Sequence, residues 1–156
     1  MRSCLAISVS VLAAILLAGC ASNDTGVAQQ ALSSALQRAD DHKAAAASAP
    51  DPGSLRRETQ AYDRDMHGML DDMTAACEGM MGSMHAGANM NMGELTQTAD
   101  AASTAVDQHR DRMMQLNDLQ QMRKECSEHS QAMTGMLGNM RTTMSRGGMM
   151  GAGGMM

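Results

Sequence analysis

Aromatic and branched apolar side chains are scarce in this 156-residue chain. It contains no Phe, no Trp and a single Tyr, and its last isoleucine is Ile15. Any core must therefore be built mainly from Met, Ala and Leu. No segment alternates apolar and polar residues with period two, so nothing in the sequence indicates a β-sheet.

Motifs of the common enzyme classes are missing as well. The sequence has no nucleophile elbow, no phosphate-binding loop and no HExxH zinc motif. The formal net charge of −5, from 17 acidic and 12 basic residues, argues against nucleic acid as a partner. Copper sites for electron transfer use one Cys, two His and a fixed axial ligand, and no such arrangement is evident along the sequence. We therefore expect a protein that is not an enzyme.

The N-terminal segment indicates the compartment. Arg2 precedes an apolar run from Leu5 to Ala18, which is too short for a membrane span but suited to a secretory leader. The run ends in Leu17-Ala-Gly-Cys20, which resembles the lipobox of bacterial lipoproteins. The resemblance implies that residues 1–19 are cleaved and that Cys20 carries lipid, including palmitate. Ala21 then points to the outer membrane, facing the periplasm. An ordinary signal peptide is the alternative.

The remainder reads as helical. Helices are expected over about 24–47, 54–85 and from residue 94 onward, separated by a Pro/Gly-rich breaker and by a loop at 86–93. A further break near residues 116–118 would give an up-down four-helix bundle. The alternative is one uninterrupted helix from residue 94. The domains are then a lipidated tether at 20–26, the bundle at 27–146 and a disordered Gly/Met tail at 147–156.

Two cysteines remain in the bundle, Cys77 and Cys126. In the bundle they are expected to be neighbours and, in an oxidising compartment, to form a disulfide. A second interpretation uses Cys126 and His129, which share a helix face at i and i+3. With Cys77 and His109 they would form a tetrahedral Cys2His2 metal pocket.

Methionine is the most abundant unusual feature. There are 20, and all but Met1 lie from residue 66 onward. Eleven fall on inward helical stripes and are expected to fill the core. The other eight lie at stripe edges, in the loop or in the Gly/Met tail, where no core needs them. Thioethers bind Cu(I) and similar soft ions without losing a proton.

This composition resembles the Met-rich periplasmic proteins of bacterial copper and silver tolerance. It implies a lipid-anchored protein that binds Cu(I) or Ag(I) for buffering, storage or tolerance and that exchanges metal with a copper-handling envelope protein. The candidate ligands are Met66, His67, Met69, Met73, Met80, Met81, Met84, His85, Met90, Met92, His109, His129, Met149, Met150, Met155 and Met156. Alternatives are a metal-free, chaperone-like envelope lipoprotein and a scavenger of oxidants through Met sulfoxide.

Overall fold

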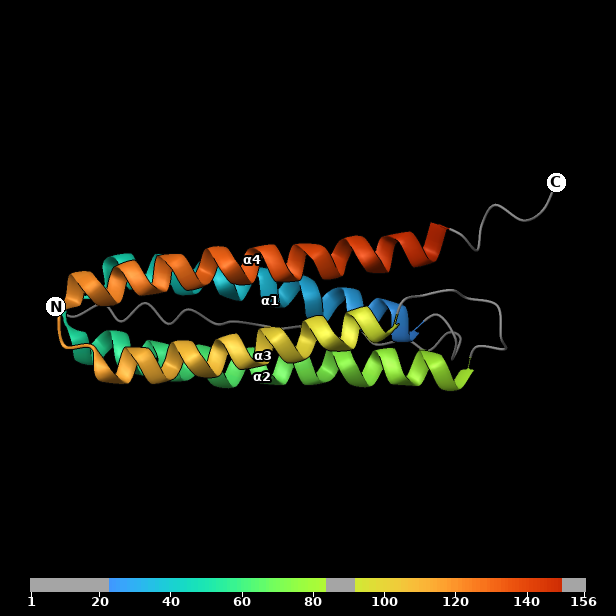
Figure 1. Ribbon diagram of the computed structural model, residues 1–156, viewed down its shortest axis with the longest axis horizontal. Helices are drawn as coiled ribbons and strands as arrows, with labels where there is room; N and C mark the ends of the chain where they lie inside the picture. The colour runs from blue at the N-terminus through green and yellow to red at the C-terminus, as the bar shows by residue number, and fades with distance from the viewer. Residues whose placement is uncertain (1–22, 84–91, 150–156) are drawn as a thin grey trace, which may run out of the picture.

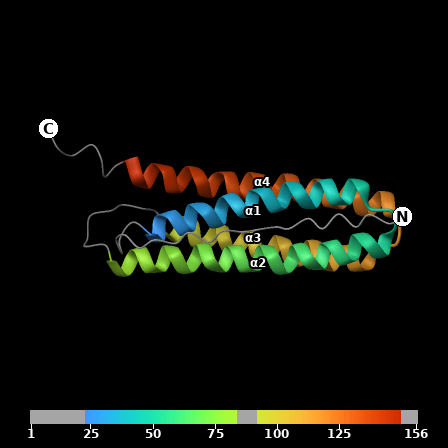
Figure 2. The ribbon, with the colours of Figure 1, turned by 180° about the vertical axis from the view of Figure 1, so that it is seen from behind.

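Four long helices form the described part of the chain. A computed structural model describes residues 23–83 and 92–149, with side chains within 26–79 and 93–146. The helices are α1 (Asn23–Ser48), α2 (Pro52–Ser83), α3 (Met92–Gln115) and α4 (Leu119–Met149). They run up and down alongside one another, with both short turns at the same end (Figures 1 and 2). Each helix packs on its two neighbours in the ring α1–α2–α3–α4.

The predicted up-down four-helix bundle is confirmed, and the uninterrupted helix from residue 94 is wrong. The chain leaves the helical conformation at residues 116–118, between α3 and α4. Several boundaries differ from expectation. Helix α1 begins at Asn23, inside the tether assigned to 20–26, and α3 begins at Met92, inside the loop expected at 86–93. Helix α4 continues through residues 147–149, which were assigned to the tail. The buried contact of Met144 holds the last turns of α4 to the bundle, and the helix propagates a turn beyond it. The rest of the predicted tail lies outside the described residues.

Each tight turn ends in an aspartate that caps the next helix. The Asp51 carboxylate accepts a hydrogen bond from the backbone nitrogen of Ser54 at 2.8 Å, and its hydrogen bonds with Ser54 lower the pKa of Asp51. Pro52 stands at the first helical position, where its missing N–H costs nothing. The Asp118 carboxylate accepts from the nitrogen of Gln121 at the same distance and starts α4. Both caps satisfy helix donors that would otherwise lack a partner.

Small and long side chains alternate around the core. Helices α1 and α3 contribute mainly alanine, and α2 and α4 contribute methionine and leucine at helical spacing. The buried alanines let the helices approach, and the flexible thioether chains fill the space between them. The core residues that show this pattern include Ala28, Ala35, Ala39, Met66, Leu70, Met73, Ala99, Ala102, Met133, Leu137 and Met140.

The two hairpins repeat each other along the sequence, with one constant offset between equivalent positions. Met66-His-Gly-Met-Leu-Asp-Asp-Met73 in α2 corresponds to Met133-Thr-Gly-Met-Leu-Gly-Asn-Met140 in α4. The capping residue Asp51 corresponds in the same way to Asp118. Because α3 follows the direction of α1, and α4 that of α2 (Figure 1), a half-turn about the long axis brings one hairpin onto the other. Equivalent residues therefore face one another across this axis.

Arginines at equivalent positions tie the hairpins together at the turn end. Arg123 of α4 donates from Nη2 to the carbonyl oxygen of Ala49 at 2.9 Å and from Nε to that of Ala46 at 3.3 Å. Arg56 of α2 donates to the carbonyl oxygen of Leu116 and, at 2.7 Å, to the side chain of Asn117. Carbonyl groups at and just after the C-terminal ends of α1 and α3 thus obtain donors from the opposite hairpin.

Replacing Arg123 by methionine is expected to lower the free energy of unfolding by about 1.5–3 kcal/mol, the usual contribution of hydrogen bonds to a charged donor. The change keeps the apolar stem but leaves two partly buried carbonyls without a donor. Chemical denaturation followed by circular dichroism measures the loss. Lys124→Met, at a neighbouring exposed position, is the control and should change stability by less than about 0.5 kcal/mol. Equal stability of the two variants would contradict the capping role.

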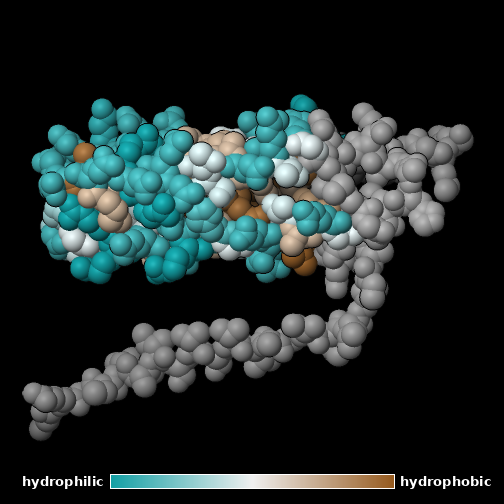
Figure 3. All heavy atoms as spheres, turned by 60° about the horizontal axis from the view of Figure 1, so that its bottom comes forward, coloured by the Kyte–Doolittle hydropathy of each residue, from teal (hydrophilic) through white to brown (hydrophobic). Residues whose placement is uncertain are grey.

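The described surface is mostly polar. Figure 3 shows a largely hydrophilic face with small apolar spots. Among the described residues, the exposed large apolar side chains are Val27 and Met114. None of the described helices combines the length and apolar character needed to cross a membrane.

Candidate metal centre

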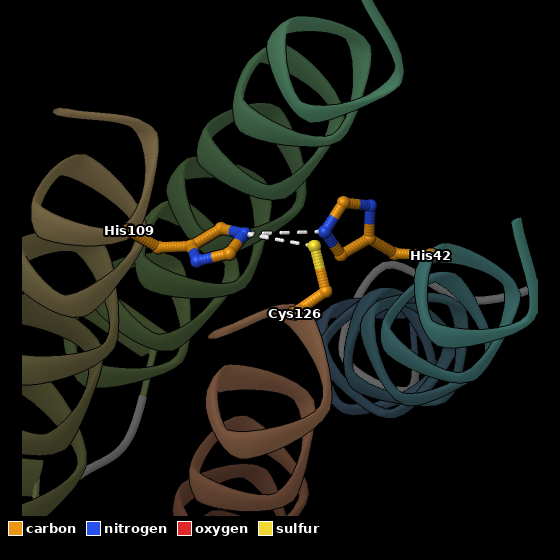
Figure 4. Close-up of side chains that lie close together, drawn as sticks. All are labelled: His42, His109 and Cys126. Carbon is orange, nitrogen blue, oxygen red and sulfur yellow. Dashed lines mark hydrogen bonds between the residues drawn. The ribbon is translucent and has the colours of Figure 1, made fainter. Parts of the chain in front are cut away.

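Two histidines from diagonally opposite helices meet on the bundle axis. His42 of α1 and His109 of α3 are completely buried. Their Nε2 atoms lie 3.2 Å apart and point toward each other (Figure 4). The two residues are equivalent in the hairpin repeat, and the half-turn symmetry explains why they face each other at the centre of the bundle.

Two sulfur atoms lie beside this pair. The Sγ atom of Cys126, from α4, is 3.8 Å from Nε2 of His109. The Sδ atom of Met113 is 3.9 Å from the same Sγ atom. One donor atom each of His42, His109 and Cys126 lie within 4.8 Å of one another. Cys126 and Met113 are both completely buried, so the cluster combines two imidazoles, a thiol and a thioether in a dry interior.

The outer nitrogen of each imidazole faces a carboxylate. Nδ1 of His42 is 3.3 Å from Oε1 of Glu58, and Nδ1 of His109 is 3.5 Å from Oε1 of Glu125. An ionised carboxylate only accepts hydrogen bonds, so these contacts favour the tautomer in which Nδ1 carries the proton and Nε2 keeps its lone pair. A histidine oriented in this way by a carboxylate is typical of metal ligands.

Each of these carboxylates is itself held by an arginine. Nη1 of Arg38 is 2.8 Å from Glu58, and Nε of Arg112 is 2.7 Å from Glu125. The positive charge of each arginine balances the carboxylate beside it. The carboxylates therefore orient the imidazoles without adding net charge to the core.

The two Nε2 atoms lie at hydrogen-bonding distance, 3.2 Å, and their roles depend on the tautomers of the two rings. With one ring as the Nε2–H tautomer, that nitrogen donates to the other; with both rings protonated at Nδ1, both Nε2 lone pairs face one point. Burial lowers the pKa of His42, and burial together with the nearby His129, His42 and Arg112 lowers the pKa of His109 to about 2. At neutral pH both rings are neutral. In the tautomer with both protons at Nδ1, a cation between the rings could accept both lone pairs.

The spacing of the donor atoms suits such a cation. Metal–nitrogen bonds of about 2.0 Å and metal–sulfur bonds of about 2.3 Å, at tetrahedral angles, separate the donors by roughly 3.3–3.8 Å. The separations of 3.2, 3.8 and 3.9 Å lie in or close to this range. The three donor atoms of His42, His109 and Cys126 all lie within 4.8 Å of one another, as ligands of one ion must.

Two further rings pack against the imidazoles of His42 and His109. The Tyr62 ring stacks on His42 with a centroid distance of 4.2 Å and an interplanar angle of 19°. The His129 ring stacks on His109 at 4.1 Å and 6°. The Tyr62 hydroxyl and Nε2 of His129 lie 3.1 Å apart, which is hydrogen-bonding distance. Tyr62 and His129 are again equivalent in the repeat, and together they fix the orientation of the two inner imidazoles.

A hollow of about 410 Å³ lies on the seam between α1 and α4. Asp40 and Lys43 line it on either side of His42 in the sequence, and Ser127 and Ser130 line it next to Cys126 and His129. The Ser130 side chain is buried, and its hydroxyl has no hydrogen-bond partner among the described residues. The hollow gives solvent an approach to the level of the cluster.

The predicted disulfide and the pocket that included Cys77 are both wrong. Cys77 and Cys126 are buried and free. Because His129 contacts Tyr62, Cys126 is level with Thr59, whereas Cys77 lies much further along α2. At about 1.5 Å per residue, the rise from Thr59 to Cys77 is about 27 Å, far beyond the reach of a disulfide. The prediction placed α4 in the wrong register against α2.

The structure brings Cys126, His109 and His129 together as predicted, but His42 takes the place expected for Cys77. His67 does not join a thioether site. Its Nε2 atom lies 3.4 Å from Asp107 and 3.8 Å from Asp63, and its Nδ1 atom lies 3.0 Å from the Ser103 hydroxyl. Arg110 already pairs with both of these carboxylates, so this half-buried group forms a network of ion pairs.

The predicted methionine ligands fall into two groups: core residues, and residues whose side chains lie outside the described ones. Met66 and Met73 are buried in the apolar core, and Met69 packs against it, so these candidate ligands serve as core residues. The side chains of the other Met and His candidates lie outside the described ones, as does Cys20, the predicted lipidation site. These are Met80, Met81, Met84, His85, Met90, Met92, Met149, Met150, Met155 and Met156.

Comparisons with known proteins add no family, because the chain matches no protein-family model, no curated protein and no solved structure. The site must be judged on its own geometry. Reasoning from the sequence missed three of its members: His42, Tyr62 and Met113 as a sulfur donor. The hairpin repeat is the signal that would have found His42, since it aligns this residue with His109.

Proposed function

We propose that this chain is a lipid-anchored envelope protein that binds a copper(I) ion in the core of its bundle. His42, His109 and Cys126 are the proposed ligands. The observation that carries the proposal is the pair of Nε2 atoms 3.2 Å apart, each on a ring whose Nδ1 faces a carboxylate. This arrangement leaves two lone pairs directed at one point beside a thiol sulfur.

The charge of the site favours a monovalent ion. Cu(I) with the thiolate of Cys126 and two neutral imidazoles has no net charge, whereas Zn²⁺ would leave one positive charge in a dry interior. Burying an unbalanced charge is costly. Thiolate and imidazole also suit Cu(I) as ligands. Ag(I) has the same charge and a similar preference for sulfur, and it is the second ion that we expect to bind.

Buffering, storage or tolerance fits a buried site better than rapid turnover. The methionines beyond the described part of the chain are candidates to collect the ion from a copper-handling partner and deliver it to the core. The lipid anchor at Cys20 would keep this activity at the outer membrane. The chaperone-like alternative has less support, because the described surface lacks the extended apolar patch that client binding requires.

Titration with Cu(I) should quench the emission of Tyr62 with one equivalent of metal. This tyrosine is the single aromatic fluorophore of the chain and stacks on His42, so it reports the core site and is insensitive to distant methionines. Replacing His42 or His109 by Ala, or Cys126 by Ser, is expected to weaken binding by about 100-fold or more, because changes in ligand support alone cost about 10–100-fold.

The titration is run anaerobically on the full chain in detergent against a competing Cu(I) chelator. Thr59→Ser is the matched control, because Thr59 is buried and occupies the position equivalent to Cys126. It should bind like the wild type. Wild-type affinity in all three ligand variants would refute the core site.

A further inference from the structure

We propose that copper at this centre is a one-electron carrier, with Met113 as the fourth and weaker ligand. The proposal rests on the proposed copper site and adds an activity to it. A set of two imidazoles, one thiolate and one long thioether contact is the set that copper electron-transfer sites use. The sequence does not reveal this ligand set, because His42 lies in the first hairpin. His109, Met113 and Cys126 all lie in the second.

Met113 is placed to serve as this ligand. It stands at position i+4 from His109 on α3, so both side chains lie on the same face of the helix. It is completely buried, and its sulfur atom is 3.9 Å from that of Cys126. Helices α3 and α4 thus supply the two sulfur atoms, which are in contact with each other beside the His42–His109 pair.

The sulfur atoms break the symmetry of the repeat. Thr59 stands where the second half has Cys126, and Ala46 stands where it has Met113. The Thr59 hydroxyl donates to the carbonyl oxygen of Leu55 at 2.9 Å and is engaged within its own helix. One hairpin therefore offers an imidazole alone, and the other offers an imidazole, a thiol and a thioether. A single thiolate distinguishes this set from the closed Cys2His2 sites of structural zinc.

The surroundings hold the ligands in one geometry. Each inner imidazole is fixed by a carboxylate at Nδ1 and by a stacked ring, Tyr62 on His42 and His129 on His109. Ligands with locked rotamers move little when the charge of the metal changes. Such a site exchanges an electron without rebuilding its coordination.

The redox step transfers one electron and no atoms. Cu(I) loses one electron to a one-electron acceptor and becomes Cu(II); no bond forms or breaks, and no proton moves, because the thiol proton has already left on metal binding. The competing loss of two electrons to an intramolecular disulfide is blocked, since Cys77 lies about 27 Å from Cys126 by the helical rise. The extra positive charge in the dry core makes Cu(II) the less favoured state, so Cu(I) is the resting form.

The test oxidises the loaded protein. The full chain carrying one equivalent of Cu(I) is treated anaerobically with one equivalent of hexachloroiridate(IV), an outer-sphere one-electron oxidant. We expect an intense visible absorption band from charge transfer between the Cys126 thiolate and Cu(II), together with a Cu(II) signal in electron paramagnetic resonance. Ascorbate should remove both, and repeated cycles should restore them with the copper retained after gel filtration.

Variants then assign the ligands. Cys126→Ser should lose the visible band. Met113→Leu should keep a thiolate band but shift its wavelength, and the reduction potential should rise, because Cu(II) loses a donor. Met133→Leu is the matched control: it is a buried methionine on α4 whose apolar cluster contains neither Met113 nor Cys126, and it should leave both the band and the potential unchanged.

Four outcomes overturn the proposal or part of it. Release of copper on oxidation, or a Cu(II) signal without the thiolate band, refutes the electron carrier but leaves the Cu(I) site in place. Identical spectra and potentials for Met113→Leu and the wild type refute Met113 as a ligand. Failure of Cu(I) to quench Tyr62 before any oxidant is added refutes the copper site itself, and the electron carrier with it.

Discussion

The apparent affinity for Cu(I) is expected to rise about tenfold with each pH unit between about pH 5 and pH 8, roughly a thousandfold in all, because one bound proton is exchanged for each ion. Burial, with smaller contributions from Glu125 and Glu58, raises the pKa of the Cys126 thiol to about 12. The thiol is therefore protonated over this whole range. Binding as a thiolate must release that proton, so higher pH favours the metal.

The imidazoles contribute less to this dependence than the thiol does. The pKa of His109 is lowered to about 2, and that of His42 is also lowered, in both cases mainly by burial. His109 is already neutral at pH 5 and releases no proton, and the lowered pKa of His42 reduces the proton release from that ring. Thioether ligands do not titrate either. The slope of one proton per copper thus identifies the thiolate and separates this site from binding by methionines alone.

The slope is measured by competition with a chromophoric Cu(I) chelator whose own pH dependence is known. Cys126→Met, which replaces the thiol with a thioether, should give an affinity nearly independent of pH. Thr59→Ser, at the equivalent position of the other hairpin, should keep the wild-type slope. A wild-type affinity that does not change with pH would exclude Cys126 as a ligand.

The metal-free protein should lose about 4 kcal/mol of stability between pH 7 and pH 5, because two buried histidines stay neutral in the fold but become protonated when the chain unfolds. Burial is the main cause that lowers the pKa of His109 to about 2 and of His129 to about 4. The unfolded chain has an ordinary histidine pKa near about 6.5. Between these values the unfolded state binds more protons, so acid favours unfolding.

The neutral buried histidines therefore stabilise the fold at neutral pH, and acid removes this stabilisation. This contribution is fully present above about pH 6.5 and declines below it by about 1.4 kcal/mol per pH unit for each histidine. It continues to decline until the folded protein also takes up the protons. Denaturant titrations at several pH values measure the loss. His129→Gln, which keeps an acceptor for the Tyr62 hydroxyl, should reduce the slope by the share of one histidine. A free energy of unfolding that is constant from pH 7 to pH 5 would contradict the buried, neutral state of these rings.

The fold followed from local features of the sequence. The breaker around Pro50 and Pro52, the absence of alternating strands and the helical spacing of Met and Leu predicted helices over about 24–47, 54–85 and from residue 94 onward. The break near residues 116–118 was inferred by bringing Cys126 near Cys77, so the four-helix bundle is right although that premise is wrong. The inward position of Met133, Leu137 and Met140 follows from the same spacing. Local patterns do not set the axial register between helices, which depends on how side chains interlock across the core. An error in that register placed Cys77 beside Cys126.

The site was half predictable for the same reason. Cys126 and His109 were placed together because both lie near the turn between α3 and α4. His129 was added because it shares a face of α4 with Cys126. His42 comes from a helix that carries mostly alanine, and one histidine on such a stripe looks like an ordinary core residue. Its role depends on meeting His109 across the axis, which only the packing of all four helices decides.

The repeat of the hairpin has a consequence for the ligand count. Two identical hairpins associating as a homodimer supply every side chain twice, so they present even numbers of each donor on the axis. A site with one thiolate and one thioether is out of reach of such a dimer. Joining the hairpins in one polypeptide lets Thr59 and Cys126, or Ala46 and Met113, differ, and an unpaired sulfur then becomes available to a single ion.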